Sequence, residues 1–348
     1  MMYKIESKLS AGLKLALIVL AGIAVLFFGK ESSSGIYKGI IFCAEVLVPS
    51  LFPFMVISAI VSKSGISFSG KILNKVSKAL FGFSGKTLIC VLIGIIGGYP
   101  VGARGIKNLF ENGEISEKEA VRASYTAVGS GPGFLITFVG MKLLNSMEIG
   151  VILFFAQFIS VIIIGILNKF IFRDTEIYNS KKENKAKIKN MSELFVSSVS
   201  SAVYGIIEMC GIVVIFSAFI SIIEGVIGEN EFIEILLEVT TACNTLSKTS
   251  YVTLIAFAVG FGGICVHFQI FQILGNIDVN KTLFFVFRII QGVITALITY
   301  FSVMAFDVSL PVFSSISGDI TLSLSTSVIG SFLLIFTGIS FLYSIKNK

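Results

Sequence analysis

Two glycine- and proline-rich segments interrupt long apolar stretches of this sequence and could do chemistry with their backbones. Gly97-Gly98-Tyr99-Pro100 lies inside an apolar run, where Pro100 lacks an N–H and must kink or break a helix. Gly129-Ser130-Gly131-Pro132 cannot form a stable helix. Backbone groups freed in this way cannot face lipid, so they are buried in protein or line a polar cavity. We therefore expect both segments to line a solute or ion pathway.

Each interruption also has a plainer explanation. Gly94, Gly98 and Gly102 repeat at a spacing of four residues, which lets a second helix approach closely. The first segment could therefore be a packing kink. The second could be a surface turn, because the sequence does not fix its depth in the membrane.

Charged side chains within apolar segments are the next candidates. Glu45 and Glu208 each lie inside a long apolar stretch, where a carboxylate is costly and usually functional or paired. Arg104 follows the first broken helix and could meet an anion. Arg122 and Arg288 are candidate partners for the two carboxylates, and a purely structural ion pair is the alternative.

The chain has one histidine, His267, which follows Gly262-Gly263 and precedes Gln269. These residues and Asn244 could line the same cavity as the first two segments. A lone histidine does not make a zinc site without acidic or thiolate partners. The alternatives are a hydrogen-bonded core histidine and a simple turn at Asn244. We predict no metal site and no cofactor.

The composition is that of a membrane protein. Of 348 residues, 55% are hydrophobic and only 14% are charged, and the mean hydropathy is +0.93. A soluble chain usually has about a quarter charged residues. The net charge of +6 comes from lysines and arginines between apolar segments, so it does not indicate a nucleic-acid partner. Phosphate-binding loops and GxSxG elbows are absent from the sequence, so an enzyme is the least favoured class.

Hydropathy predicts a multi-pass protein of the cell membrane. The expected spans are 12–29, 37–62, 87–110, 147–172, 195–226, 249–274, 282–306 and 323–345. Two amphipathic pieces, Lys71–Phe81 and Glu231–Thr241, lie between spans, and the first suits the membrane surface.

Basic residues set the expected orientation. The lysine-rich linker Arg173–Asn190 marks the cytoplasmic side, and the N-terminus is also expected there. Two acidic clusters, Glu111–Glu119 and Glu224–Glu234, are then expected outside. To keep the linker inside, segment 121–144 must be a re-entrant loop rather than a crossing.

The two halves of the chain resemble each other. Glu45 aligns with Glu208, Gly97-Gly98 with Gly262-Gly263, and Arg122 with Arg288, at separations of 163, 165 and 166 residues. The charge argument starts the first repeat outside and the second inside. This is the inverted-repeat plan of many secondary transporters.

The sequence resembles the sporulation integral membrane protein YlbJ family, whose members carry nucleoside-recognition Gate domains. The resemblance rests on PSLFPF (Pro49–Phe54), GGYPVGA (Gly97–Ala103), Glu119-Ala120 and FGGICVHFQ (Phe261–Gln269). It implies a transporter-like membrane protein of spore-forming bacteria, associated with spore cortex formation. Gate domains also occur in nucleoside and ferrous-iron transport proteins, so the resemblance implies no particular substrate.

The expected fold is all-α: a polytopic helical bundle of two inverted Gate-like repeats with broken or re-entrant helices. The expected divisions are an N-terminal anchor (1–36), a first repeat (37–172), a cytoplasmic linker (173–194) and a second repeat (195–348). The sequence leaves two hypotheses for the function: a permease for a small polar solute, and a non-transporting scaffold for spore envelope assembly. The expected partners are the lipid bilayer and an unidentified solute, and homo-oligomer formation is left open.

Overall fold

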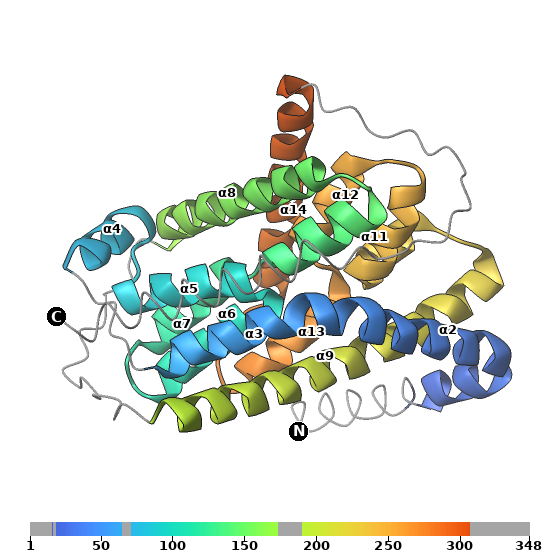
Figure 1. Ribbon diagram of the computed structural model, residues 1–348, viewed down its shortest axis with the longest axis horizontal. Helices are drawn as coiled ribbons and strands as arrows, with labels where there is room; N and C mark the ends of the chain where they lie inside the picture. Colours follow the sequence, from blue (N-terminus) through green and yellow to red (C-terminus); the bar gives the residue numbers. More distant parts are fainter. Residues whose placement is uncertain (1–15, 17–18, 65–70, 173–189, 307–348) are drawn as a thin grey trace, which may run out of the picture. The chain divides into compact units, whose positions relative to one another are not determined.

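The computed structural model describes residues 16, 19–64, 71–172 and 190–306, and these form helices joined by short loops (Figure 1). The span expected at 323–345 falls outside the described residues, as do 12–15 and 17–18 of the span expected at 12–29. Five described helices are long and apolar enough to cross a membrane: Gly29–Ile60, Met147–Ile171, Met191–Ile227, Val252–Leu274 and Lys281–Ala305. The all-helical membrane fold is therefore confirmed.

Two long helices lie antiparallel along each other. The first is continuous through α2 (Gly29–Phe42), the π-helical turn η1 (Cys43–Leu47) and α3 (Val48–Lys63), and the second is α9 (Met191–Ile227) (Figure 1). Gly35 packs on the backbone of Ser217, and the Lys63 ammonium donates to the Ser197 carbonyl 2.6 Å away. The small residues of α2 allow this close approach.

Helices α5 (Gly85–Gly97) and α6 (Tyr99–Glu111) fold back on each other around Gly98. A Cβ on Gly94 would lie 2.6 Å from the Gly102 Cα, and Lys86 at the start of α5 forms a 2.6 Å ion pair with Glu114 beyond α6. Gly98 has φ +86°, a left-handed conformation that lets the chain reverse. The prediction of one span at 87–110 is therefore wrong, because this segment is a helical hairpin, here called hairpin 1.

Helix α4 (Lys71–Phe81) precedes hairpin 1 and makes an angle of 79° with α5. Its apolar side chains Ile72, Val76 and Leu80 are exposed at a spacing of four residues, with Lys75 and Lys78 beside them. This amphipathic surface is suited to the membrane interface, as the lysine spacing predicts.

The next segment, α7 (Glu117–Thr126) and the π-helix η2 (Gly133–Leu143), runs antiparallel to α8 (Met147–Ile171) along most of its length. Arg122 hydrogen-bonds to Asn168 near one end of α8, and Gly140 touches Gly150 near the other. Eighteen residues of α8 separate these contacts, or about 27 Å, close to the thickness of a hydrocarbon core. The re-entrant loop expected at 121–144 is therefore wrong, because the segment is a broken crossing.

The hairpin and the broken crossing also change the side of the membrane on which the first acidic cluster, Glu111–Glu119, is expected. Glu114 pairs with Lys86, and Glu119 accepts hydrogen bonds from the Ser84 N–H and the Thr87 hydroxyl. This end of the protein also holds Asn168, a few residues before the basic linker. The acidic residues 111–119 therefore lie at the linker's end and not at the opposite one, because hairpin 1 returns the chain to the side it entered from.

The second half contains the same kinds of element. Helices α10 (Glu231–Leu237) and α11 (Val239–Lys248) fold back at Glu238, since the Glu234 carboxyl reaches the Thr245 hydroxyl; this is hairpin 2. Helices α12 (Val252–Phe261) and α13 (Gly263–Leu274) continue through Gly262 as a broken crossing.

The broken crossing α12–α13 lies antiparallel to α14 (Lys281–Ala305). A Cβ on Gly260 would lie 2.7 Å from the Gly292 Cα, and the Lys281 ammonium lies over the Phe271 ring. Gly97-Gly98 at a hairpin tip and Gly262-Gly263 in a crossing are therefore unlike elements, although the sequence aligns them.

The two ends of the molecule can be distinguished by thiol labelling in intact cells. On a background without the natural cysteines, we expect Glu229→Cys to react with a membrane-impermeant maleimide and Glu114→Cys to react only after permeabilisation. Equal reaction of both cysteines in intact cells would mean that 85–111 is a crossing after all.

Candidate functional site

Four interruptions of the helical backbone meet around one small cavity of about 30 Å³. They are the tips of hairpins 1 and 2, the break in α7–η2, and the break in α12–α13, which contributes Val266 and Gln269 to the lining while Gly262 and Gly263 lie outside it. The residues that line the cavity include Gly97, Gly98, Tyr99, Pro100, Ser130, Gly131, Glu238, Val239, Thr240, Val266 and Gln269. Side chains of α3 and α9, such as Leu51 and Met209, close the remaining wall. The sequence predicted the participation of both glycine- and proline-rich segments.

Each hairpin tip packs directly on the backbone of one broken crossing. A Cβ on Gly131 would lie 2.9 Å from the Ile96 carbonyl oxygen and 3.2 Å from the Gly98 nitrogen. A Cβ on Gly263 would lie 3.1 Å from the Leu237 carbonyl oxygen and 3.2 Å from the Glu238 nitrogen. Only glycine fits either contact without displacement of backbone.

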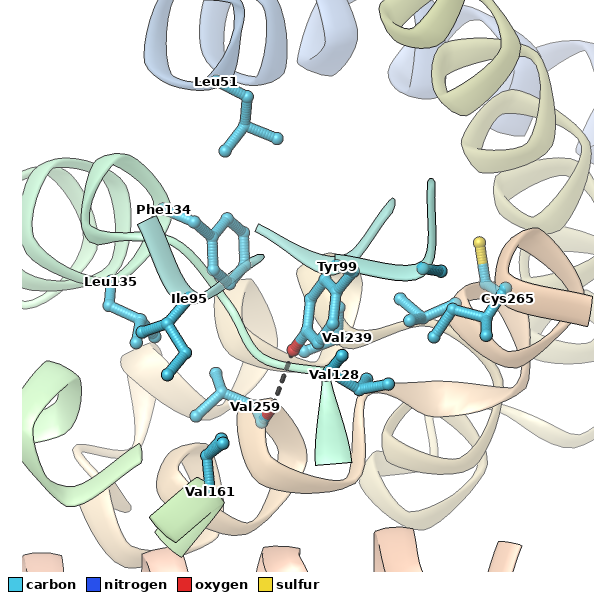
Figure 2. Packing of buried hydrophobic residues seen from close by; sticks show 14 of the residues in the cluster. Leu51, Ile95, Tyr99, Val128, Phe134, Leu135, Val161, Val239, Val259 and Cys265 are labelled. Atoms are coloured by element: carbon cyan, nitrogen blue, oxygen red, sulfur yellow. Dashed lines mark hydrogen bonds between the residues drawn. The ribbon is translucent and has the colours of Figure 1, made fainter. Parts of the chain in front are cut away.

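Tyr99 ties hairpin 1 to both broken crossings. Its hydroxyl donates to the Val259 carbonyl at 2.6 Å and receives a hydrogen bond from the Ser130 hydroxyl at 2.5 Å. Figure 2 shows the Tyr99 ring pointing toward Val259, with Val128 and Val239 nearby. The buried phenol therefore satisfies a carbonyl at the end of α12.

Two glutamines make reciprocal contacts between the halves. Gln157 of α8 donates to the Val259 carbonyl at 3.3 Å, just before the break at Gly262. Gln291 of α14 donates to the Val128 carbonyl at 3.1 Å, just before the break at Gly129. Each half thus supplies an amide to a carbonyl that the other half's break leaves without its helical partner.

Arg288 reinforces the second of these contacts. Its guanidinium is buried and donates to the Val128 carbonyl at 3.1 Å and to the Tyr125 carbonyl. Positive charge is favoured at the C-terminal end of a helix, where the dipole is negative, and α7 ends here. Arg288 thus contacts a helix end, whereas the sequence suggested Glu45 or Glu208 as its partner.

Glu238, which the sequence analysis did not single out, lies at the tip of hairpin 2. Its carboxylate caps α11, accepting the Thr240 N–H at 3.0 Å and the Thr241 N–H at 2.7 Å. It is 2% exposed and lines the central cavity. Its signal in the sequence was a carboxylate directly after the apolar Ile235-Leu236-Leu237.

An acidic vestibule of about 640 Å³ leads to the cavity from the end where α9 finishes. Glu45 and Asn244 line this vestibule and not the cavity itself. Its charged lining is Lys38, Glu45, Lys142, Glu224, Glu229, Glu234, Glu238 and Lys248. Glu238 and Thr240 face both spaces, so they form the boundary between the vestibule and the cavity.

A second vestibule of about 580 Å³, the Arg104 vestibule, lies toward the linker's end. Arg104 and Glu208 form a 2.7 Å ion pair at its inner end, and Gln272 donates to Glu208 at 2.5 Å. A gap of about 10 Å³ lies between this group and the central cavity, and it shares Pro100, Met209 and Gln269 with the cavity lining. Glu208 thus pairs with Arg104, and Arg122 instead caps α4 through the Phe81 carbonyl.

His267 and Gln269 occupy different environments although they are two residues apart. Gln269 lines the central cavity. The imidazole Nε2 of His267 lies 3.0 Å from the Phe261 carbonyl, and the ring packs edge-on against Phe261 and Phe284. The structure therefore places His267 in the core, at the C-terminal end of α12, outside the described cavities that Gln269 faces.

Comparison with known proteins gives one relation. The chain is a distant homologue of the sporulation integral membrane protein YlbJ of Bacillus subtilis (strain 168), with 23% identity over an alignment that covers 72% of each chain. No protein-family model matches the chain, and no solved structure matches it significantly. The resemblance to YlbJ seen in the sequence motifs is thus confirmed, and a Gate domain is not directly shown.

The close contact between hairpin 1 and the first break predicts a specific cost. Gly131→Ala should destabilise the protein by about 1–3 kcal/mol, because its methyl group would press on the backbone of hairpin 1. Gly211→Ala is the matched control, since Gly211 lies within α9 with nothing within 4 Å of its Cβ position. Thermal unfolding in detergent measures both; an equal melting temperature for the two variants would contradict the observed packing.

Proposed function

We propose that this protein is a membrane permease that binds a small polar solute at the central cavity. The observation that supports this most is a series of adjacent spaces: the acidic vestibule, the central cavity, the gap at Gln269 and the Arg104 vestibule. Neighbouring spaces share lining residues, so they lie in series between the two ends of the protein. Interrupted helices surround its narrowest part, as in many secondary transporters.

The described conformation is a closed one in this proposal. The central cavity of about 30 Å³ has room for one or two water molecules but not for a solute. Opening requires a hairpin to move away from the broken crossing on which it packs. The Arg104–Glu208 pair would close the route on the linker's side, and Glu238 with Thr240 on the other.

We infer that the two halves are inverted repeats, in a register that differs from the sequence alignment. Hairpin 1 corresponds to hairpin 2, α7–η2 to α12–α13, and α8 to α14. The reciprocal glutamines support this register, because Gln157 and Gln291 hold equivalent positions in α8 and α14. The Ser160 and Thr295 hydroxyls, 3.0 Å apart where α8 meets α14, also support this register, because they lie at nearly the same position in the two helices.

A membrane scaffold is the second candidate, and the small size of the central cavity favours it. Glycine contacts such as Gly94–Gly102 could then serve only to pack helices. A scaffold does not account for two polar vestibules that converge on one point. In either case the relation to YlbJ supports a role in a sporulation membrane. We place the linker's end in the cytoplasm, in keeping with the positive-inside rule.

A ligand screen on the purified protein tests the permease proposal. Nucleosides, dicarboxylates and metal ions are added to the full-length chain, and the melting temperature is measured. A compound that raises it should then be taken up by proteoliposomes containing the protein and not by empty ones. If a stabilising compound is never transported, or if no compound of these classes stabilises the protein, the scaffold is the better explanation.

Removal of the Arg104–Glu208 pair separates the two functions. Both side chains are about one-third exposed, so the pair contributes only about 0–1 kcal/mol and the fold should persist. We expect Arg104→Gln combined with Glu208→Gln to abolish or uncouple function in cells while the protein level stays normal. The control is Lys107→Gln combined with Glu111→Gln, a looser surface pair at 3.8 Å. Full function of the first double variant would contradict a permease.

A further inference from the structure

Glu234 is a buried carboxylate in the wall of the acidic vestibule. It lies on α10 of hairpin 2, is 1% exposed, and is one helical turn from the hairpin tip at Glu238. Its Oε2 atom is buried and accepts no hydrogen bond. A buried carboxylate oxygen without a donor carries an uncompensated desolvation cost, so it calls for an explanation such as a bound proton or ion.

The nearest polar partners of Glu234 are the Thr245 hydroxyl on α11 and a second carboxylate, that of Glu224 on α9. Two ionised carboxylates have no donor to share, so they can hydrogen-bond to each other only when one carries a proton. The two carboxylates thus provide acceptors for a hydrogen bond between them, and one bound proton would provide the donor.

We propose that Glu234 and Glu224 together bind one proton, and that this proton is the ion coupled to solute movement. The coupling part rests on the permease function proposed above, whereas the binding part does not. Glu234 lies on α10, the first helix of hairpin 2, and the second helix, α11, begins at the central cavity. Protonation of Glu234 therefore changes the charge of the hairpin that must move when the cavity opens. The charged and titratable groups that line the vestibule with Glu234 are Tyr37, Lys38, Glu45, Lys142, Glu224, Glu229, Glu238 and Lys248. Helix α13, which packs against α10, carries Cys265 and His267.

A proton fits this site better than a metal ion. Among the described residues, no group of three or more histidine, cysteine and acidic side chains is arranged to hold a metal. Burial raises the pKa of Glu234 to about 7, and the neighbouring charge of Glu224 adds to the effect. Glutamate in an unfolded chain has a pKa of about 4.3, so Glu234 stays protonated in the folded protein between these values.

This difference sets the sign of a stability effect. Between pH 4.3 and pH 7 the folded state holds a proton that the unfolded state has lost, so stability falls as the pH rises through about this range and levels off above it. Glu234→Gln mimics the protonated form. Its melting temperature should therefore exceed that of the wild type at pH 8 and converge with it near pH 5. Glu231→Gln, one turn earlier on α10, should show no such convergence.

Infrared titration of the full-length protein in lipid nanodiscs tests proton binding directly, with the proton as the only probe. We expect a protonated-carboxyl band that disappears with a midpoint near pH 7, is absent in Glu234→Gln and persists in Glu231→Gln. In Glu224→Gln, which keeps Glu234, the midpoint should move to lower pH. A band that is unchanged in both Glu234→Gln and Glu224→Gln would overturn the site. A midpoint that follows the sodium concentration, with choline as the control, would assign the site to sodium instead.

Coupling is tested apart from binding. Solute uptake that depends on a pH gradient in the wild type and loses this dependence in Glu234→Gln supports the proposal. Uptake indifferent to the gradient in the wild type overturns the coupling role and leaves the permease standing. A normal titration with no uptake of any solute removes the permease and keeps the proton site.

Discussion

Backbone polar groups must be satisfied wherever a helix is interrupted within the membrane, and the rest of this structure depends on that constraint. Four interruptions meet at one place, and each leaves carbonyls or amides without helical partners. Gln157 and Gln291 satisfy carbonyls across the interface between the halves, and Tyr99 adds a second donor at Val259. Glu238 does the same for amides at the start of α11. An interior built this way holds satisfied polar groups at each interruption, while mostly apolar side chains line the central cavity.

Much of this arrangement can be predicted from local sequence. Glycine and proline at Gly97–Pro100 and Gly129–Pro132 specify interruptions whatever surrounds them, and both line the central cavity. Whether a chain kinks or reverses at such a point is decided by long-range packing. Hydropathy could not distinguish the hairpin at Gly98 from the crossing through Gly131, since each joins one apolar helix to one more polar helix over a similar length. The sequence analysis predicted a crossing at 87–110 and a re-entrant loop at 121–144, whereas the structure has the hairpin first and the crossing second. The number of crossings before the linker is the same in both cases.

The repeat register failed for a related physical reason. Gly97-Gly98 and Gly262-Gly263 look alike because glycine pairs suit both a reversal and a kink, so the match identified a shared need for flexibility rather than an equivalent position. The register that we propose rests instead on the polar residues of the crossings. Gln157 and Gln291 occupy the same place in helices of equal length, because a buried amide is needed opposite each break. Glu234 and Glu238 were undervalued since their burial arises only when hairpin 2 folds back.

Water access to the central cavity tests the account most directly. Gln269 lies between the cavity and the Arg104 vestibule, and a cysteine there can be exposed to a small charged thiol reagent on either side of sealed vesicles. The account predicts slow reaction of Gln269→Cys from both sides, as each route opens in turn, with fast reaction of Asn244→Cys in the acidic vestibule. No reaction at position 269 from either side, in a folded protein whose Asn244→Cys reacts normally, would contradict it.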